Sequence, residues 1–300
     1  MRNVLIVLIV LFSGRLSAQQ PAIKPFYKMS NPEIAKIIRS TSALPITVTR
    51  KMNILSARFL GTPYNFKCVG DGPYALMEPW PLVNFKETNC MSYCEHVLAL
   101  SISDSWDNFF DNLQQIRYRD GLIGMKTRNH YTMADWLPQN SWLLKDVSRT
   151  IGGSLTKMLT RTISHRKFFA AKGITDMRDV KPDRTITIDY IPLNDLLKVA
   201  DNFHNGDIAC LIDAQHDNIF SAHMIMIMIV NGSRVIREST TSGMSTFDTP
   251  FVKWVKDKQA HKSDRYLGLA VMRVRDELNT PGRIIKPWDI PGLKAKFANH

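Results

Sequence analysis

The stretch that decides the fold is Asn89-Cys90-Met91-Ser92-Tyr93-Cys94-Glu95, because it places a cysteine where a loop gives way to a helix. The spacing of apolar residues predicts a helix over residues 90–101, with Asn89 as its N-cap. The free N–H groups and the dipole at a helix start favour the thiolate form of a cysteine. Cys90 is therefore the candidate nucleophile, and Cys94, one turn deeper, is predicted to pack inward. The alternative for Cys90 is an ordinary buried thiol.

A general base for this thiol is offered by His223, which stands at the head of the apolar run 223–230. This Met/Ile run predicts a strand buried on both faces, and such a strand would hold the imidazole ring in place. A third polar group usually orients the base, and Glu238 on the following strand is the first candidate, with Ser239 the weaker one. Taken alone, His223 could equally be a core histidine bonded to a backbone carbonyl.

The remaining pattern divides into helices first and strands after, which predicts an α+β fold with an antiparallel sheet. Asn31 as N-cap and Pro32 as the first helical residue indicate the start of a helix, and Asn231-Gly232 indicates a hairpin turn. We predict a single domain over residues 19–300. The predicted helices cover residues 31–40, 52–60, 90–101 and 104–116, with short ones within 145–157 and 192–202, and the predicted strands cover 185–190, 208–213, 223–230, 234–238 and 266–275.

The first 18 residues have the pattern of a secretory signal peptide. A short positive segment precedes the apolar run 4–12, and Leu16-Ser17-Ala18 forms a small-x-small cleavage site. Arg15 leaves an uncleaved anchor as the alternative. We expect no stable membrane span after cleavage, and a periplasmic or otherwise exported protein of a bacterial cell envelope. The sequence does not specify an oligomeric state.

The net charge of the chain is +12, and cleavage would remove Arg2 and Arg15 to leave +10. A basic exported protein suits an anionic envelope polymer. No nucleic-acid-binding motif is present, so we expect no nucleic-acid partner. The alternative is that the scattered basic residues only aid solubility.

Four cysteines allow two disulfides in an oxidising compartment, but their positions argue against two. Cys90 and Cys94 are four residues apart on one predicted helix, a geometry that rarely suits a disulfide. Cys210 lies in an apolar strand, where a free thiol behaves as a small hydrophobe. A bridge from Cys68 to Cys90 or Cys94 remains open.

Metal chemistry has weak support in the sequence. His204, Asp207, His216 and His223 are close along the chain, but none has the short helical spacing that places two ligands on one face. We expect neither a metal nor a cofactor.

Two clusters, residues 117–121 and 127–131, combine arginine with aromatic side chains and histidine. Arginine binds carboxylates through two parallel hydrogen bonds, and aromatic rings stack on sugars. The alternative is a solvated loop with a few ion pairs.

These residues together resemble the N-acetylmuramoyl-L-alanine amidase-like family of NlpC-type, papain-like bacterial cell-wall hydrolases. The resemblance spans residues 30 to 275, and the Arg-Tyr-Arg-Asp-Gly and Arg-x-His-Tyr pieces are its most specific parts. The matching segments, in order, are Gly61-Thr62-Pro63-Tyr64, residues 89–95, 116–121 and 127–136, Gly206-Asp207-Ile208 and Ala222-His223.

The resemblance implies a papain-like fold in which N-terminal helices carry Cys90 and an antiparallel sheet carries His223. It places Tyr64 beside the cysteine and the helix glutamate at Glu95. Three residues would line the substrate groove: Arg128, His130 and Tyr131.

The chain departs from the family pattern at several positions. Asn89 replaces the usual aspartate, and Met224-Ile225-Met226 fills a stretch where a glycine is usual. The family often has His-Ala-Ser where this chain has Arg237-Glu238-Ser239, so the third catalytic position would fall on Arg237. Arginine cannot accept a hydrogen bond from the imidazole. A shift of one residue would place Glu238 at the third catalytic position instead, but it would reverse which side chains of the strand face the site.

The resemblance implies a cysteine amidase that cleaves the N-acetylmuramoyl-L-alanine bond of peptidoglycan or its fragments through a Cys90 thioester, with His223 and Glu238. Three alternatives remain open: a stem-peptide endopeptidase or transamidase of the same fold, a catalytically inactive cell-wall binding protein, and a disulfide-stapled secreted effector.

Overall fold

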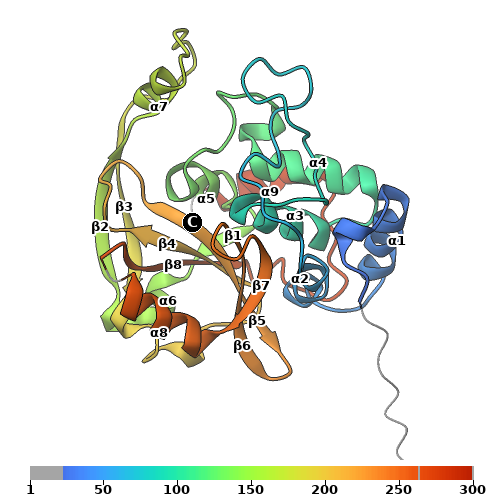
Figure 1. Cartoon of the computed structure of the whole chain (residues 1–300). Helices are drawn as coiled ribbons and strands as arrows, with labels where there is room; N and C mark the ends of the chain where they lie inside the picture. The colour runs from blue at the N-terminus through green and yellow to red at the C-terminus, as the bar shows by residue number, and fades with distance from the viewer. Residues whose placement is uncertain (1–22, 263, 299–300) are drawn as a thin grey trace, which may run out of the picture.

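The centre of the molecule is one eight-stranded sheet in which every pairing is antiparallel (Figure 1). The computed structural model describes residues 23–298 except residue 263. The strand order is β2-β3-β8-β4-β5-β6-β7, with β1 paired to β8. The strands are β1 (Leu144–Asp146), β2 (Lys157–Ile163), β3 (Arg184–Pro192), β4 (Asp207–Asp213), β5 (Ser221–Val230), β6 (Ser233–Thr240), β7 (Ser245–Pro250) and β8 (Tyr266–Val274). The predicted α+β class with an antiparallel sheet is confirmed.

The helices divide between the two faces of this sheet (Figure 1). On one face, α3 (Cys90–Ser101) packs against β5 and β6, and the same apolar layer contains α1 (Asn31–Ser42), α2 (Val48–Ala57), α4 (Trp106–Arg117) and α9 (Ile290–Phe297). The other face packs against α6 (Ser148–Gly152) and α8 (Phe251–His261). Short turns complete the chain: η1 (Phe26–Lys28), η2 (Arg119–Gly121), the π-helical η3 (Thr132–Trp136), α5 (Leu137–Gln139), η4 (Gly153–Leu155), η5 (Leu193–Asp195), η6 (Ala200–Asn202) and η7 (Pro287–Asp289).

Strand β5 separates the two apolar layers, because successive side chains of a strand point to opposite faces. Met224, Met226 and Met228 pack in the layer that contains α3, whereas Ile225 and Ile227 pack in the layer that contains α8. All five side chains are buried. The predicted strand buried on both faces is therefore confirmed, and it gives His223 a rigid support.

Helix α3 has the bounds that the sequence predicts, and Asn89 caps it. The Asn89 side chain accepts a hydrogen bond of 2.8 Å from the Ser92 amide, while the Ser92 hydroxyl accepts one of 2.9 Å from the Asn89 amide. This reciprocal capping box fixes the chain at the entry to the helix. Every residue from Ser92 to Ser101 is buried, so the helix is enclosed between the sheet and its neighbours.

Three predicted boundaries are wrong in detail. Helix α1 is capped by Ser30 rather than Asn31, because Glu33 completes a capping box with the earlier residue. Helix α2 begins at Val48, four residues before the predicted start, since Thr47 caps it. Residues 192–202 form the separate turns η5 and η6 in place of a helix.

The residues of β2, β7, α8 and α9 show too little periodicity for these elements to be predicted. The arm formed by β2, α7 (His165–Ala171) and β3 was also not predicted. In this arm β2 and β3 form a hairpin with α7 between them, and the arm projects from the sheet, drawn in yellow-green in Figure 1. Strand β2 pairs only with β3 at the end of the sheet, and most of its side chains are exposed. An exposed edge strand lacks the apolar alternation that makes a half-buried strand recognisable.

The predicted signal peptide, residues 1–18, lies outside the described residues. Within residues 23–298, no helix combines the length and the apolar character that crossing a bilayer requires. All four cysteines lie in the described part of the chain and all four are free thiols, so the open disulfide alternatives are wrong for this structure.

Candidate active site

Cys90 and His223 meet where α3 and β5 begin, although 132 residues separate them in the chain. The Cys90 thiol is within hydrogen-bonding reach of the His223 side chain and of the backbone amides of Met224 and Met91. Burial opposes ionisation of the thiol, but the charge of His223 and these hydrogen bonds bring the pKa of Cys90 below its ordinary value. The arrangement favours a thiolate at the start of the helix.

The His223 ring is held on its far side by Glu238. Nε2 of His223 donates a hydrogen bond of 2.8 Å to Oε2 of Glu238, which leaves Nδ1 as the ring nitrogen available to the Cys90 thiol. Burial alone would lower the pKa of His223, but the negative charge of Cys90 and the Glu238 carboxylate raise it to about 9. Both shifts favour the thiolate–imidazolium form of the pair.

Glu238 is itself fixed by Trp254 of α8, a residue that the sequence did not indicate. The indole Nε1 donates a hydrogen bond of 2.9 Å to Oε1 of Glu238. Burial raises the pKa of this carboxyl group, but the bond from His223, nearby Lys258 and the indole together hold it below its ordinary value. Both oxygens of Glu238 thus have partners, and the carboxylate has one orientation.

The structure corrects the position-by-position comparison with the family, which would place the third catalytic residue at Arg237. Arg237 lies opposite Met226 in the β5–β6 pairing, so its side chain enters the layer on the α3 side. There it donates two hydrogen bonds of 2.7 Å to Asp248 and one of 2.8 Å to Ser56. The next residue, Glu238, shares the face of His223 by the period of the strand. Ser239, the weaker candidate, donates to the Thr88 carbonyl instead.

Tyr64, which the resemblance places beside the cysteine, is close enough to Cys90 for the thiolate charge to act on its phenol. Its amide donates to the Met244 carbonyl at 3.0 Å, and a parallel bridge joins it to Thr88, two residues before Cys90. Burial and the negative charge of Cys90 and Cys68 raise the pKa of Tyr64 to about 12. The phenol therefore stays protonated at neutral pH and is able to act as a hydrogen-bond donor.

A cavity of about 400 Å³, the catalytic cavity, opens over the thiol. Cys90, His223 and the backbone around Met224 form part of its wall. Of the three residues that the resemblance places in a substrate groove, Arg128 and His130 line this cavity, whereas Tyr131 lines an adjoining groove.

Arg128 faces the catalytic cavity from within an ion-pair network. It donates to Glu78 at 2.6 Å and lies 3.6 Å from Asp71. Lys172, at the end of α7, also donates to Glu78, at 2.9 Å. Glu78, Lys172 and aromatic Trp80 line the cavity, and no motif in the sequence pointed to them.

His130 is a neutral wall residue. Its Nε2 donates to the Met125 carbonyl at 2.7 Å, and its ring centroid lies 4.5 Å from that of Phe168. Burial lowers the pKa of His130 to about 4. His130 therefore presents an uncharged ring to a ligand at neutral pH.

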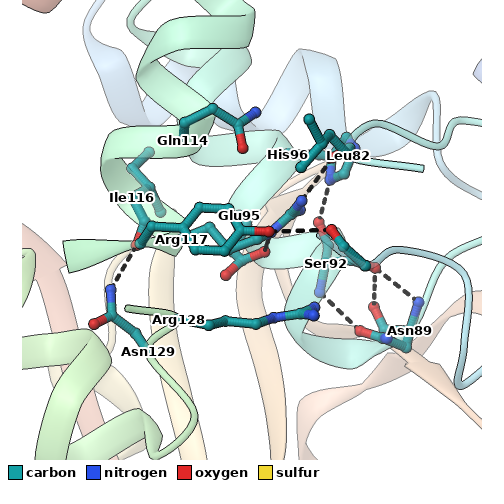
Figure 2. A network of polar contacts seen from close by, with 12 residues as sticks. Leu82, Asn89, Ser92, Glu95, His96, Gln114, Ile116, Arg117, Arg128 and Asn129 are labelled. Atoms are coloured by element: carbon teal, nitrogen blue, oxygen red, sulfur yellow. Dashed lines mark hydrogen bonds and ion pairs between the residues drawn. The ribbon is translucent and has the colours of Figure 1, made fainter. Parts of the chain in front are cut away.

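In the first arginine cluster, Arg117 and Tyr118 are buried and have a structural role, whereas Asp120 is exposed and pairs with Lys294. Arg117 is buried and donates to Glu95 at 2.7 Å and to the Leu82 carbonyl at 2.6 Å (Figure 2). The Tyr118 hydroxyl donates to Asp71 at 2.8 Å. Figure 2 shows Arg117 and Glu95 beside Ser92 and Asn89, the residues of the capping box. This network joins α4 and the irregular loop 70–81 to the helix that carries Cys90.

The other three thiols are unsuited to nucleophilic attack. Cys94 is buried, as predicted, and burial raises its pKa well above the ordinary value. Burial raises the pKa of Cys210 to about 12, and also raises that of Cys68, whose Sγ lies 3.3 Å from the Ser92 hydroxyl. Only Cys90 combines partial exposure with a lowered pKa.

Three of the four residues considered as metal ligands, Asp207, His216 and His223, have other partners. Asp207 pairs with Arg273 at 2.6 Å, and His216 pairs with Asp213 at 3.0 Å. Among the residues that the structure describes, no three His, Cys, Asp or Glu side chains gather as a metal ion would need.

The N-acetylmuramoyl-L-alanine amidase-like family matches this chain over residues 54–261, more than half of its length. The chain belongs to this amidase-like family. It is accordingly an enzyme, and the match includes Cys90, His223, Glu238 and Trp254. No curated protein is similar enough to this amidase-like chain to match it.

Two solved structures share the fold of this amidase-like enzyme. A protein from Legionella pneumophila is 19% identical, with a TM-score of 0.73 and coverage of 81% of this chain and 94% of its own. An N-acetylmuramoyl-L-alanine amidase from Bacteroides uniformis is 22% identical, with a TM-score of 0.61 and coverage of 76% of this chain and 99% of its own. At these identities the likeness concerns the fold.

Proposed function

We propose that this enzyme hydrolyses the amide bond between N-acetylmuramic acid and L-alanine in peptidoglycan or its fragments, with Cys90 as nucleophile. The observation that carries the proposal is the chain of contacts Cys90–His223–Glu238, in which a thiol at a helix start faces an imidazole that a carboxylate holds. These contacts support amide hydrolysis by a covalent intermediate, and the proposal includes a papain-like, NlpC-type fold within a single domain.

In the first step the Cys90 thiolate attacks the lactyl carbonyl carbon of the muramoyl group. The carbonyl electrons move to oxygen, and the oxyanion is stabilised by backbone N–H groups at the start of α3 and by the Tyr64 hydroxyl. The imidazolium of His223 then gives its proton to the alanine nitrogen. The C–N bond breaks, the stem peptide leaves with a free amino group, and a muramoyl thioester remains on Cys90.

In the second step a water molecule attacks the thioester carbonyl while His223, now neutral, accepts its proton. Collapse of this tetrahedral intermediate breaks the C–S bond and releases the muramic acid carboxylic acid. Cys90 returns to the thiolate and His223 to the imidazolium. Glu238 keeps Nε2 of the ring protonated and stabilises its positive charge throughout, as the carboxylate of a triad does.

The proposal includes export to the bacterial envelope, with peptidoglycan or muropeptides as partners. Its support is the sequence of residues 1–18, together with the basic charge of the chain. Cell fractionation followed by N-terminal sequencing of the mature protein tests this part. A protein retained in the cytoplasm with an intact leader would contradict export without affecting the chemistry.

Mass spectrometry of muropeptides incubated with the wild type and with Cys90→Ala tests the function. We expect free stem peptide with an N-terminal alanine from the wild type alone. Cleavage within the stem would make the enzyme an endopeptidase with the same mechanism. No product from either protein would support the inactive binding protein instead, and an equal rate from both would exclude Cys90 as nucleophile.

A further inference from the structure

Lys258 of α8 lies next to the chain of contacts that leads away from the thiol, and no step of the proposed mechanism uses it. It follows Trp254 by four positions, so the two side chains lie on the same face of the helix. The Nζ atom of Lys258 is 5.1 Å from the centroid of the Trp254 ring. The indole that fixes one oxygen of Glu238 is therefore itself covered by a cation.

A second aromatic ring contacts the same ammonium group. Nζ of Lys258 lies 5.9 Å from the ring centroid of Tyr266, at the start of β8. Within the described part of the chain, this ammonium group has no hydrogen bond or ion pair, whereas Lys253 on the same helix pairs with Asp257 at 2.5 Å. Cations are attracted to the faces of aromatic rings at these distances. The two rings therefore define the position of this half-buried lysine.

The charge of Lys258 also acts on the Glu238 carboxyl group. Burial raises the pKa of Glu238, but the hydrogen bond and charge of His223, followed by the charge of Lys258, bring it below its ordinary value. Burial raises the pKa of Tyr266, so its phenol is neutral at neutral pH. The charged and titratable groups around Glu238 and Tyr266 are His223, Lys258, Arg265 and Asp213.

These contacts lie apart from the place where a ligand would bind. Neither Lys258 nor Trp254 belongs to the wall of the catalytic cavity. A ligand over the thiol therefore does not contact them. An effect of Lys258 on the reaction has to pass through Glu238 and His223.

We infer that Lys258 is a positioning residue for the active site. Its ammonium group holds the Trp254 indole against the Glu238 carboxylate, and the carboxylate in turn keeps the His223 ring in place for Cys90. The inference rests on the proposed function and deepens it. The geometry requires a cation over the indole rather than a lysine in particular.

Two substitutions at this position test the inference. Methionine is a long side chain without charge, whereas arginine keeps a cation that stacks on aromatic rings. We expect Lys258→Met to lower kcat on muropeptides by about two- to tenfold with KM unchanged, and Lys258→Arg to retain most of the rate. Lys256→Met, at an exposed position of the same helix, is the matched control and should leave kcat unchanged.

The alkaline limb of the pH profile separates positioning from a simple charge effect. The Glu238 carboxylate contributes to the raised pKa of His223. When the indole no longer holds this carboxylate, the limb should move to lower pH, and we expect this of Lys258→Met. Removal of a cation that acted only by its charge would instead favour the imidazolium and move the limb to higher pH. A limb that moves to higher pH, or stays in place, would overturn the inference.

A double-mutant cycle determines whether Lys258 acts through the indole. Phenylalanine keeps a ring at position 254 but cannot donate to Glu238. We therefore expect Lys258→Met to lower kcat by less than about twofold further when Trp254→Phe is already present. Losses that multiply independently would contradict a role through Trp254.

Alkylation of Cys90 by iodoacetamide separates failure of this inference from failure of the proposed function, because it needs no muropeptide. Lys258→Met should move the rise of the alkylation rate to higher pH in the otherwise wild-type protein, but not in Trp254→Phe. This pattern supports the inference even if no muropeptide is hydrolysed. An alkylation profile that Lys258→Met leaves unchanged, or moves equally in both backgrounds, would overturn it while leaving the amidase chemistry intact.

Discussion

Glu238 and His223 lie on adjacent strands, two positions out of direct register, and share the face of the sheet toward α8, where His223 Nε2 donates to Glu238 Oε2 at 2.8 Å. Direct opposition would bring the Cβ atoms closest, but a diagonal pair remains within reach of long side chains. The diagonal placement lets the glutamate carboxylate meet the ring edge while Nδ1 stays free for Cys90. The geometry of the site therefore depends on the register of β5 and β6.

Replacing Cys90 by alanine should lower kcat by at least about a thousandfold, because the other active-site groups cannot form the thioester. The thermal unfolding midpoint should change little, since Cys90 is only partly buried. Muropeptide hydrolysis and a thermal melt of the same samples check both expectations. Cys68→Ala, at a buried thiol, is the control that should retain activity. Full turnover by Cys90→Ala would remove this residue from the mechanism.

Activity should follow a bell-shaped pH profile set by the thiolate–imidazolium pair. On the acid side kcat/KM falls as Cys90 gains a proton, and this limb lies below the ordinary thiol pKa because the Cys90 pKa is lowered. On the alkaline side activity falls through the His223 pKa, raised to about 9, because the leaving amine loses its proton donor.

Iodoacetamide alkylation of Cys90 reports the acid limb alone. Its rate should rise with pH through the lowered Cys90 pKa, and His223→Ala should move that rise to higher pH by removing the positive charge beside the thiol. Peptide mapping should place the fast label on Cys90, and the three buried thiols should react only on unfolding. An alkylation profile unchanged by His223→Ala would contradict the ion pair.

Glu238→Gln should lower kcat about ten- to a thousandfold, since an amide no longer stabilises the imidazolium and need not hold the correct tautomer. The raised pKa of His223 depends in part on the Glu238 carboxylate, so the alkaline limb of the pH profile should move to lower pH. Trp254→Phe should produce the same shift to a smaller extent, because it frees one oxygen of Glu238. A loss of activity with the alkaline limb unmoved would indicate a general structural effect.

The buried pair of Arg117 and Glu95 should be important for stability. Arg117→Met leaves Glu95 buried without its partner, and we expect a loss of about 3–5 kcal/mol in the free energy of unfolding. The double variant Arg117→Met/Glu95→Leu should recover part of this loss, because no uncompensated charge remains. Urea denaturation measures both.

The exposed pair Lys253–Asp257 on α8 is the matched control for that experiment. Lys253→Met should change the free energy of unfolding by less than about 1 kcal/mol, as is usual for surface ion pairs. An Arg117→Met variant as stable as the control would show that the buried pair contributes little.

Much of the architecture could be predicted because it is encoded locally. The N-cap of Asn89 and the apolar spacing after Cys90 define α3, and the unbroken apolar run after His223 defines a strand buried on both faces. The arm between β2 and β3 escaped prediction, since its strands are exposed and its threonines pair across the hairpin rather than with the core.

The sequence by itself determined the nucleophile candidate, the base candidate and the α+β class, because capping and hydrophobic periodicity act over a few residues. The tertiary structure alone decided that Glu238 rather than Arg237 faces the imidazole, and that Trp254 orients the Glu238 carboxylate. It also decided that Arg117 supports α3 from within the core. These outcomes depend on strand register and on contacts between distant segments. Such contacts are fixed by the packing of the whole domain, so a local sequence pattern does not predict them.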